Sequence, residues 1–242
     1  QDISRVLYQL VMQQSIVIDQ EKVYIFQQYE EERLTALMVA KRIQAARQPF
    51  QIENELEQAQ QVLGITLSER QKQAVRMVFE SPLSIITGGP GTGKTTVLKV
   101  ILYIHGLKCK TSVQLMAPTG RAARRMAEST GKEDASTMHM ALGLLGGSDY
   151  NLGFQYLEAE FLNVDEVSMV DMHLAYEFFS RVKENARVLL LGDVDQLPSV
   201  GAGDVFRQLI GCGLIPVTIL DMVYRQGASS NIPVNANLIQ QN

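Results

Sequence analysis

The stretch that decides the fold runs from Ile85 to Ile101 and reads IITGGPGTGKTTVLKVI. Two isoleucines lead into a glycine cluster, after which Lys94 opens a segment with helical periodicity. The pattern G-x-x-x-x-G-K-[ST] between a strand and a helix is typical of a loop whose backbone N–H groups surround a nucleotide's phosphates. A glycine-rich turn without a ligand is the alternative, and it does not account for the whole pattern. The predicted nucleotide-binding residues are Gly89, Pro90, Gly91, Thr92, Gly93, Lys94, Thr95 and Thr96.

A second motif supplies the acidic groups that phosphate chemistry needs. The segment FLNVDEVSM (161–169) places Asp165 and Glu166 at the end of an apolar strand. We expect Asp165 and the Thr95 hydroxyl to hold Mg²⁺, Lys94 to lie between the β- and γ-phosphates, and Glu166 to activate the attacking water as general base. A solvent-exposed acidic strand end is the alternative for an isolated Asp-Glu pair.

Four short aliphatic runs alternate with amphipathic helices from residue 83 onward. Continuous apolar strands separated by helices indicate a parallel sheet that is covered on both faces. The ligand of such a sheet binds beyond the carboxyl ends of its strands. We therefore predict an α/β fold in which helices cover both faces of a parallel sheet, and the glycine motif makes it a P-loop NTPase. The runs are LSIIT (83–87), VQLMA (113–117), FLNVD (161–165) and RVLLLGD (187–193).

The residues before the sheet form a separate pattern. Residues 3–12 have helical spacing, SIVID and KVYIF alternate like two strands of a hairpin, and residues 29–46 read as a strong helix. This order suggests a small helical, winged-helix-like accessory unit, and a helical cap on the next domain is an equal alternative. The expected divisions are an accessory unit at 1–48, a linker helix at 49–66, the sheet domain at 67–220 and the start of a further domain at 221–242.

Composition narrows the class of protein. The 242 residues are 46% hydrophobic and 20% charged, a balance that indicates a folded globular chain rather than a disordered one. The net charge of −4 excludes a wholly basic surface but allows a local basic groove. Cys109 and Cys212 form no metal or disulfide pattern. No apolar run or signal peptide indicates a membrane or export, so we expect a cytoplasmic protein, and Gln1 in place of Met suggests a piece of a longer one.

Two glutamines accompany the phosphate loop. Gln71, in LSERQKQAV, lies just before the first expected helix of the sheet domain, and its amide matches the N6/N7 edge of adenine. A solvated helical glutamine is the alternative. Gln196 follows the strand RVLLLGD in a loop braced by Gly192 and Pro198, where a neutral side chain can detect the γ-phosphate, with Asp193 orienting it.

Five ordered motifs resemble those of a superfamily 1 DNA helicase of the RecD/TraA type, which includes stand-alone RecD-like proteins and exodeoxyribonuclease V alpha subunits. The resemblance spans roughly residues 1–230, and its segment VYIF…YEEERLTALMVAKRI also resembles the region before the motor in the longer RecD-like proteins. The motifs are Gly88–Thr96, APTGRAA (117–123), DEVSM (165–169), GDVDQLP (192–198) and VYRQ (223–226).

The resemblance implies a reaction and assigns roles. It implies that residues 67–220 form a RecA-like ATPase motor domain and that residues 221–242 begin a second motor domain. It also implies ATP-driven 5′ to 3′ movement on single-stranded DNA, with unwinding at single-strand/duplex junctions in repair or recombination. Gln71 would then contact adenine, Gln196 would couple the γ-phosphate to motion, and Arg225 would be the arginine finger. The chain ends soon after Arg225, so we expect a second motor domain beyond it and weak activity of this part alone.

The DNA contacts rest on two further segments. In MAPTGRAARRM, Thr119 is a predicted helix N-cap, and free N–H groups at Gly120 and Arg121 suit a DNA phosphate. Arg121, Arg124 and Arg125 add positive charge, and a capped helix with a solvated basic face is the alternative. The segment STMHMALG aligns with a second DNA-contact motif, which makes Thr137 and His139 candidates.

Three positions depart from the family pattern, and other classes of protein are kept as alternatives. Asn163 stands where the family has a buried aliphatic residue, Met140 where a basic residue often follows the histidine, and Tyr224 where phenylalanine is usual. A different P-loop enzyme, such as a sensor ATPase or a small-molecule kinase, would need a lid and an acceptor site. A DNA-binding module without motor activity would bind DNA independently of nucleotide.

Overall fold

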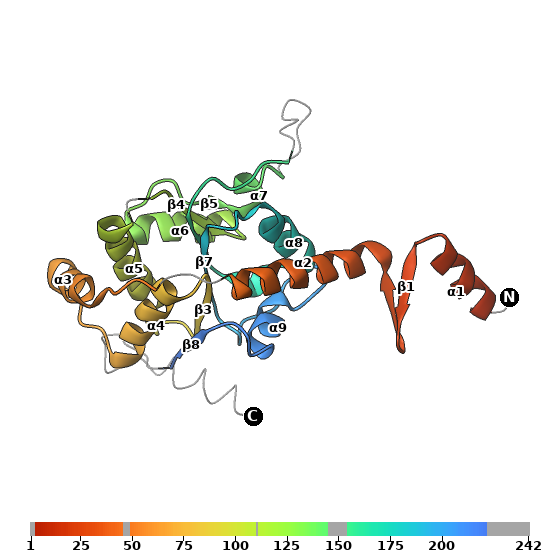
Figure 1. Ribbon diagram of the computed structural model, residues 1–242, viewed down its shortest axis with the longest axis horizontal. Helices are drawn as coiled ribbons and strands as arrows, with labels where there is room; N and C mark the ends of the chain where they lie inside the picture. Colours follow the sequence, from red (N-terminus) through yellow and green to blue (C-terminus); the bar gives the residue numbers. More distant parts are fainter. Residues whose placement is uncertain (1–2, 46–48, 110, 145–153, 222–242) are drawn as a thin grey trace.

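A six-stranded parallel sheet forms the centre of the computed structural model, which describes residues 3–45, 49–109, 111–144 and 154–221 (Figure 1). The strand order is β5-β4-β6-β7-β3-β8. The four predicted runs are confirmed as strands, whereas β5 and β8 were not anticipated. The strands are β3 (Leu83–Gly88), β4 (Val113–Ala117), β5 (Ser136–Thr137), β6 (Phe161–Val164), β7 (Arg187–Gly192) and β8 (Val217–Leu220).

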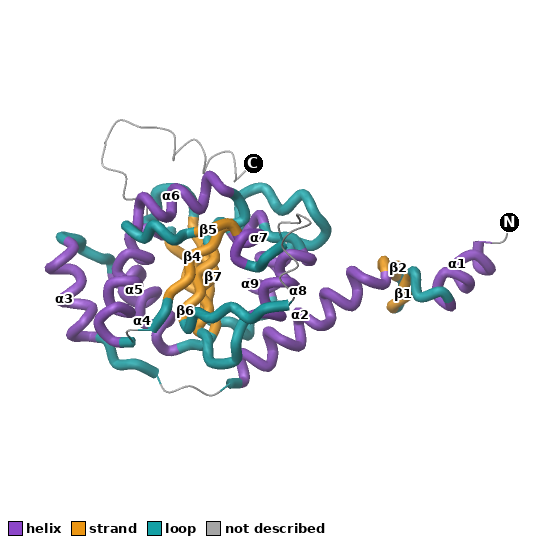
Figure 2. The backbone as a smooth tube through the Cα atoms, turned by 90° about the horizontal axis from the view of Figure 1, so that it is seen from above, coloured by secondary structure: helices purple, strands orange, loops and turns teal. Residues whose placement is uncertain are grey.

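Helices cover both faces of this sheet, as the α/β prediction required (Figure 2). The central strands β3 and β7 are buried along their whole length, which is why they read as continuous aliphatic runs. One buried cluster lies beneath α3 (Glu53–Leu63), α4 (Glu69–Glu80), α5 (Lys94–Lys108) and α6 (Gly120–Thr130). The opposite cluster lies beneath α2 (Phe26–Gln44), α7 (Met138–Ala141), α8 (Met172–Arg181) and α9 (Val205–Gly211).

The helix α4 begins earlier than the sequence suggested. Ser68 is its N-cap, and the Ser68 hydroxyl accepts a hydrogen bond from the Gln71 backbone N–H at 3.2 Å. The Gln71 side-chain oxygen accepts from the Ser68 N–H at 3.0 Å, which completes a capping box. The expectation that Gln71 precedes this helix was therefore wrong, because Gln71 is the third residue of α4.

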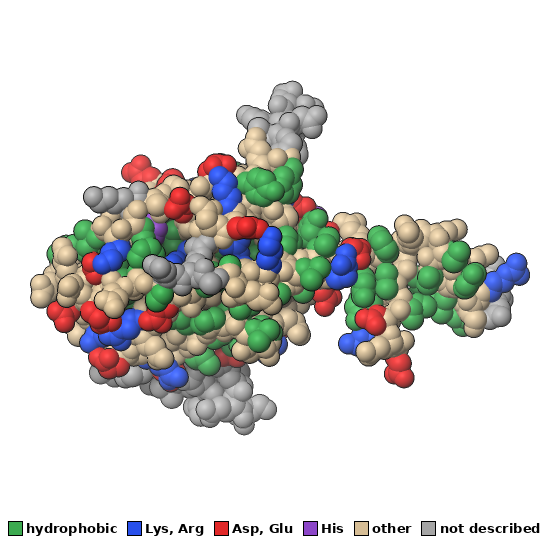
Figure 3. Space-filling view, viewed as in Figure 1, with side chains coloured by type: hydrophobic (Ala, Val, Ile, Leu, Met, Phe, Trp, Pro, Cys, Tyr) green, Lys and Arg blue, Asp and Glu red, His purple; other side chains and the backbone are tan. Residues whose placement is uncertain are grey.

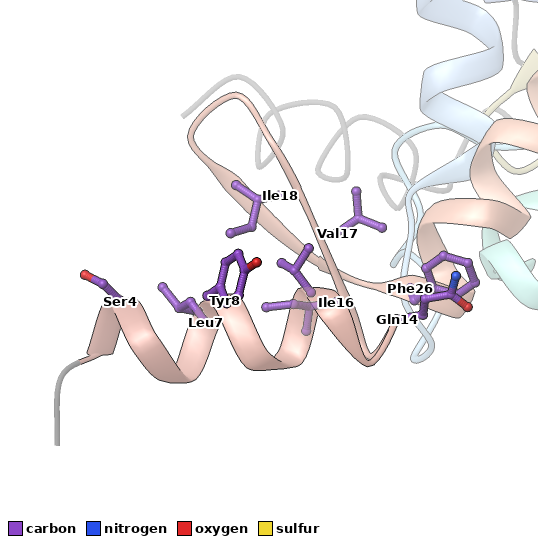
Figure 4. A pocket seen from close by; sticks show the side chains of 9 residues that line it. Ser4, Leu7, Tyr8, Gln14, Ile16, Val17, Ile18 and Phe26 are labelled. Atoms are coloured by element: carbon purple, nitrogen blue, oxygen red, sulfur yellow. The ribbon is translucent and has the colours of Figure 1, made fainter.

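The N-terminal residues form the expected helix, hairpin and helix. Helix α1 (Ile3–Met12) is followed by the antiparallel strands β1 (Ile16–Asp19) and β2 (Lys22–Ile25), and then by α2. We call residues 3–25 the projecting unit, because they extend away from the body of the molecule (Figures 1 and 3). A hollow between α1 and the hairpin has apolar side chains, including Leu7, Tyr8 and Ile16 (Figure 4). The winged-helix likeness stays a prediction.

Helix α2 joins the projecting unit to the body, where it packs along α8. The buried Arg42 guanidinium donates hydrogen bonds to the carbonyls of Ala186, Val182 and Lys183 at 2.7, 3.1 and 2.9 Å. Those carbonyls lie in the segment that connects α8 to β7, so Arg42 fastens α2 to the chain just beyond the end of α8. The division of the chain at residue 48 stays a prediction, since α2 itself packs on the sheet domain.

Candidate nucleotide site

The phosphate loop connects β3 to α5 in the predicted way. Gly91 and Gly93 have φ angles of +82° and +92°, a left-handed conformation that glycine adopts without steric cost. The buried Thr92 hydroxyl donates to the Gly89 carbonyl at 2.9 Å and fixes the loop from inside. The Lys94 ammonium donates to the carbonyls of Gly88 and Gly89, so its charge is held over the loop.

A pocket of about 740 Å³ opens at this loop. It brings together residues that lie up to about a hundred positions apart in the chain: the loop, the acidic motif after β6 and Gln196 after β7. Its predicted lining residues are Gly89, Pro90, Gly91, Gly93, Lys94, Thr95, Thr96, Asp165, Glu166 and Gln196. The sequence had not linked the others to the nucleotide, and they all lie on α6: Ala122, Arg125, Met126, Glu128 and Ser129.

Burial shifts the pKa values of two charged groups in the pocket. Loss of water lowers the pKa of Lys94, while the carboxylates of Asp193, Asp165 and Glu166 act in the opposite direction. Loss of water also raises the pKa of Asp165, although the Glu166 N–H, which donates to Asp165 at 2.8 Å, and Lys94 favour its charged form. A phosphate on Lys94 and a cation on Asp165 would each compensate a charge that the fold has withdrawn from water.

The acidic motif also has an unusual backbone. Glu166 has a φ angle of +54°, a left-handed conformation that costs a non-glycine residue of order 1 kcal/mol. The turn allows Val167 and Ser168 to begin a short 3-10 helix, η1 (Val167–Met169), while Glu166 stays on the pocket wall. Such conformations cluster at active sites, where the surrounding packing holds them.

The donor set suits Mg²⁺ better than a metal bound by protein alone. The Thr95 hydroxyl and the Asp165 carboxylate line one pocket with Lys94. No group of three or more His, Cys, Asp or Glu side chains suited to a metal occurs in the part of the chain that the structure describes. Mg²⁺ characteristically takes one or two protein ligands and fills its shell with phosphate oxygens and water. The residues present therefore fit a cation that arrives with a nucleotide.

Gln196 lies in a loop that the neighbouring helix holds in place. Its backbone N–H donates to the Asp193 carbonyl at 3.2 Å, and its exposed side chain lines the pocket. Further along the loop, the Ala202 carbonyl accepts from the Met172 N–H at 2.8 Å. A Cβ at Gly201 would meet the Asp171 carboxylate at 2.1 Å, so the loop passes very close to the start of α8.

Gln71 braces the phosphate loop from behind. Besides its capping bond, its amide nitrogen donates to the Thr92 carbonyl at 3.3 Å, and the side chain is 4% exposed. Gln71 and Thr92 are the two predicted nucleotide contacts of this region that lie outside the pocket lining. The amide keeps one N–H and one lone pair for another partner. Its contact with adenine stays a prediction.

The candidate DNA contacts gather at the same edge of the sheet. Thr119 is the N-cap of α6 and accepts from the Ala122 N–H at 3.2 Å, as predicted. Thr137 is the N-cap of α7, and its strand β5 pairs with β4 so that Thr137 lies opposite Ala117. Thr119, Gly120 and Thr137 therefore lie at two adjacent strand ends, with Arg121 and His139 exposed beside them.

Of Asn163 and Arg225, which the sequence analysis singled out, the structure describes only Asn163. Asn163 is completely buried in β6, where its amide nitrogen donates to the Met126 sulfur at 3.3 Å. Arg225 and the VYRQ motif lie outside the described residues, so the arginine-finger assignment stays a prediction. No helix among the residues described is both long and apolar enough to cross a membrane.

These features define a P-loop nucleoside triphosphate-binding domain with a RecA-like sheet. Comparison with known families agrees, because the model described as an AAA domain matches residues 71–202, more than half of the chain. The chain belongs to this AAA domain family. The matched segment begins at Gln71, and it includes both acidic and glycine motifs of the pocket.

Individual relatives match more than half of this chain. The RecD subunit of the RecBCD enzyme of Haemophilus influenzae is 39% identical over 163 residues, which cover 57% of this chain and 26% of the relative. The ATP-dependent RecD2 DNA helicase of Deinococcus radiodurans is 41% identical over 172 residues, which cover 69% of this chain and 23% of the relative. The chain thus spans about a quarter of the length of these relatives.

Solved structures show the same architecture. The Pif1 helicase from Candida albicans superposes with a TM-score of 0.54 at 25% identity, covering 73% of this chain and 44% of that one. A second structure, of two coordinating Pif1 helicases at forked duplex DNA, gives a TM-score of 0.51 at 21% identity and supports the fold alone.

Proposed function

We propose that this chain carries the nucleotide-binding part of an ATP-dependent DNA helicase. It would couple Mg²⁺-ATP hydrolysis to 5′ to 3′ movement on single-stranded DNA and would open duplex at single-strand/duplex junctions. The observation that carries the proposal is one sheet edge with two kinds of site. The pocket holds Lys94, Glu166 and Gln196, and the adjacent strand ends hold Thr119 and Thr137.

Each pocket residue has a role consistent with its position. Lys94 would bind the transferred phosphate, Thr95 and Asp165 would hold Mg²⁺, and Glu166 would orient and deprotonate the attacking water. Gln196 would respond to the γ-phosphate, because its side chain lines the pocket. Its loop also contacts the start of α8, so the response could reach that helix. Bound Mg²⁺ would neutralise the charge that develops on the phosphate oxygens.

The relatives support the DNA half of the proposal. Their names include a RecD subunit of a RecBCD enzyme and an ATP-dependent RecD2 DNA helicase. A role in DNA repair or recombination, in the cytoplasm and together with a second motor domain, is part of the same proposal. No observation favours the small-molecule kinase or the nucleotide-independent DNA-binding module.

The test measures ATP binding and hydrolysis by the chain with and without single-stranded DNA. We expect Lys94→Ala to weaken both by roughly 100-fold, since it removes a charge from the developing transition state. We expect a Mg²⁺-ATP analogue to change the affinity of the chain for single-stranded DNA, in either direction. ATP binding and hydrolysis that DNA does not affect would contradict the helicase proposal.

A further inference from the structure

Helix α6 forms one whole wall of the nucleotide pocket. Five of its residues line the pocket, and among them Arg125 and Glu128 are exposed and charged. Arg125 and Ser129 are four residues apart, so they share one face of the helix. The sequence had grouped Arg125 with Arg121 and Arg124 as charge for DNA, but the structure places Arg125 in the nucleotide pocket instead.

The adjacent arginine provides a natural comparison. Arg124 is also exposed on α6, but it does not line the pocket. Many cations elsewhere are engaged in ion pairs, such as Arg76 with Glu53 at 2.8 Å and Lys108 with Glu55 at 2.7 Å. Arg125 forms no ion pair or hydrogen bond with any residue that the structure describes, even though Glu128 is only three positions away. Its five donor N–H groups are therefore available to a ligand.

The charge balance of the pocket also calls for a second cation. Lys94 is the cation of the phosphate loop, and its ammonium is a single point charge. Asp165, Glu166 and Glu128 bring three carboxylates to the same pocket, so Lys94 and the proposed Mg²⁺ only balance these carboxylates and leave the charge of a polyphosphate uncompensated. An additional guanidinium in the pocket offsets part of that charge, and its planar fork matches phosphate oxygens in a bidentate way.

We propose that Arg125 binds the polyphosphate of the nucleotide from the α6 side of the pocket. This inference rests on the proposed nucleotide-binding function and adds a contact that the loop motifs do not contain. It also gives α6 different ligands at its start and at its middle. Thr119, Gly120 and Arg121 at its start are the candidate DNA contacts, and Arg125 lies about 6 Å further along the helix.

The experiment measures the affinities of ATP, ADP and AMP, each with Mg²⁺, by competition against a fluorescent ATP analogue on the 242-residue chain. The variants are Arg125→Ala, Arg125→Lys, the matched control Arg124→Ala, and Lys94→Ala. We expect Arg125→Ala to weaken ATP binding about tenfold, which is typical of a lost charge-assisted hydrogen bond. Arg125→Lys should restore part of the loss, and Arg124→Ala should match the unsubstituted chain.

The nucleotide series locates the contact. A loss that is large for ATP and absent for AMP supports binding to the β- and γ-phosphates. An equal loss for all three nucleotides overturns the polyphosphate assignment, as does an effect of Arg125→Ala no larger than that of Arg124→Ala. If the unsubstituted chain binds none of the nucleotides, or binds them independently of Lys94, the proposed function itself fails.

Discussion

The nucleotide edge of the sheet and the projecting unit are built from contacts of very different range. At the edge, Gly89, Asp165 and Gln196 meet although long stretches of chain separate them. In the projecting unit the hairpin pairs Ile16 with Ile25, and none of the ten residues of α1 is buried. The edge is therefore fixed by the packing of the whole domain, whereas the projecting unit depends on its immediate neighbours in sequence.

Exposure follows the same division. The projecting unit leaves many large apolar side chains in water, and they spread over its surface in Figure 3. They are Ile3, Val6, Tyr8, Val11, Met12, Ile18, Val23 and Ile25. The sheet domain instead has two large clusters of buried apolar residues. Changes near the pocket should thus affect ligand binding. The joint between the two regions is the contact of α2 with α8, and changes there should affect stability.

The largest effect is expected from Gly93→Ala. A Cβ at Gly93 would lie 2.4 Å from the Gln71 amide nitrogen, and Gly93 has a φ of +92°. We expect ATP affinity to fall roughly 100-fold, because displacing the loop misplaces its phosphate donors. Gly64→Ala is the matched control, since Gly64 also has a positive φ but has nothing within 4 Å. Equal ATP affinity in the two variants would refute the role of the Gln71 brace.

The joint is tested by Arg42→Ala. Removing the guanidinium leaves the carbonyls of Val182, Lys183 and Ala186 without this donor, and we expect the free energy of unfolding to fall by about 3 kcal/mol. Chemical denaturation measures the loss. Arg33→Ala, which removes an exposed pair with Glu30 on the same helix, should leave the transition nearly unchanged. A similar small change for Arg42→Ala would mean that α2 is not anchored there.

Acid should weaken the sheet domain through His105. Burial, helped by Arg187 and Lys132, lowers the pKa of His105 from 6.5 to about 4. Stability from this group is complete above pH 6.5 and falls as the pH drops toward 4, because only the unfolded chain accepts the proton. The total loss is up to about 3 kcal/mol. Denaturation of His105→Gln between pH 4 and 7 should show a shallower pH dependence, and an unchanged slope would contradict the assignment.

Alkali should weaken the joint, but only slightly. The His173 imidazole lies 2.8 Å from the buried Glu31 carboxylate, which raises the pKa of His173 above 6.5. This contribution is complete below pH 6.5 and is lost as the pH rises through the raised pKa. We expect less than about 1 kcal/mol, because His173 is half exposed and the pair is screened. Its absence in His173→Gln, measured by denaturation from pH 6 to 9, checks the sign.

Much of the fold could be predicted because the signals were local. The four aliphatic runs became β3, β4, β6 and β7, since strands buried on both faces must be apolar throughout. The two-residue β5 is too short to produce a period, and β8 is a four-residue run that a buried helix segment could equally contain. The order of the strands in the sheet could not be predicted, because no single segment of the sequence indicates which strands are neighbours.

The candidate site divides in the same way. The sequence by itself determined the phosphate loop and the acidic motif, because glycine, Lys94 and Asp165 are required locally by backbone shape and charge. Only the tertiary structure decided that Arg125 faces the nucleotide pocket while Arg124 does not, and that Arg42 anchors α2 to the end of α8. A helix pattern gives the face of a residue, but only the packing of distant elements decides what that face meets.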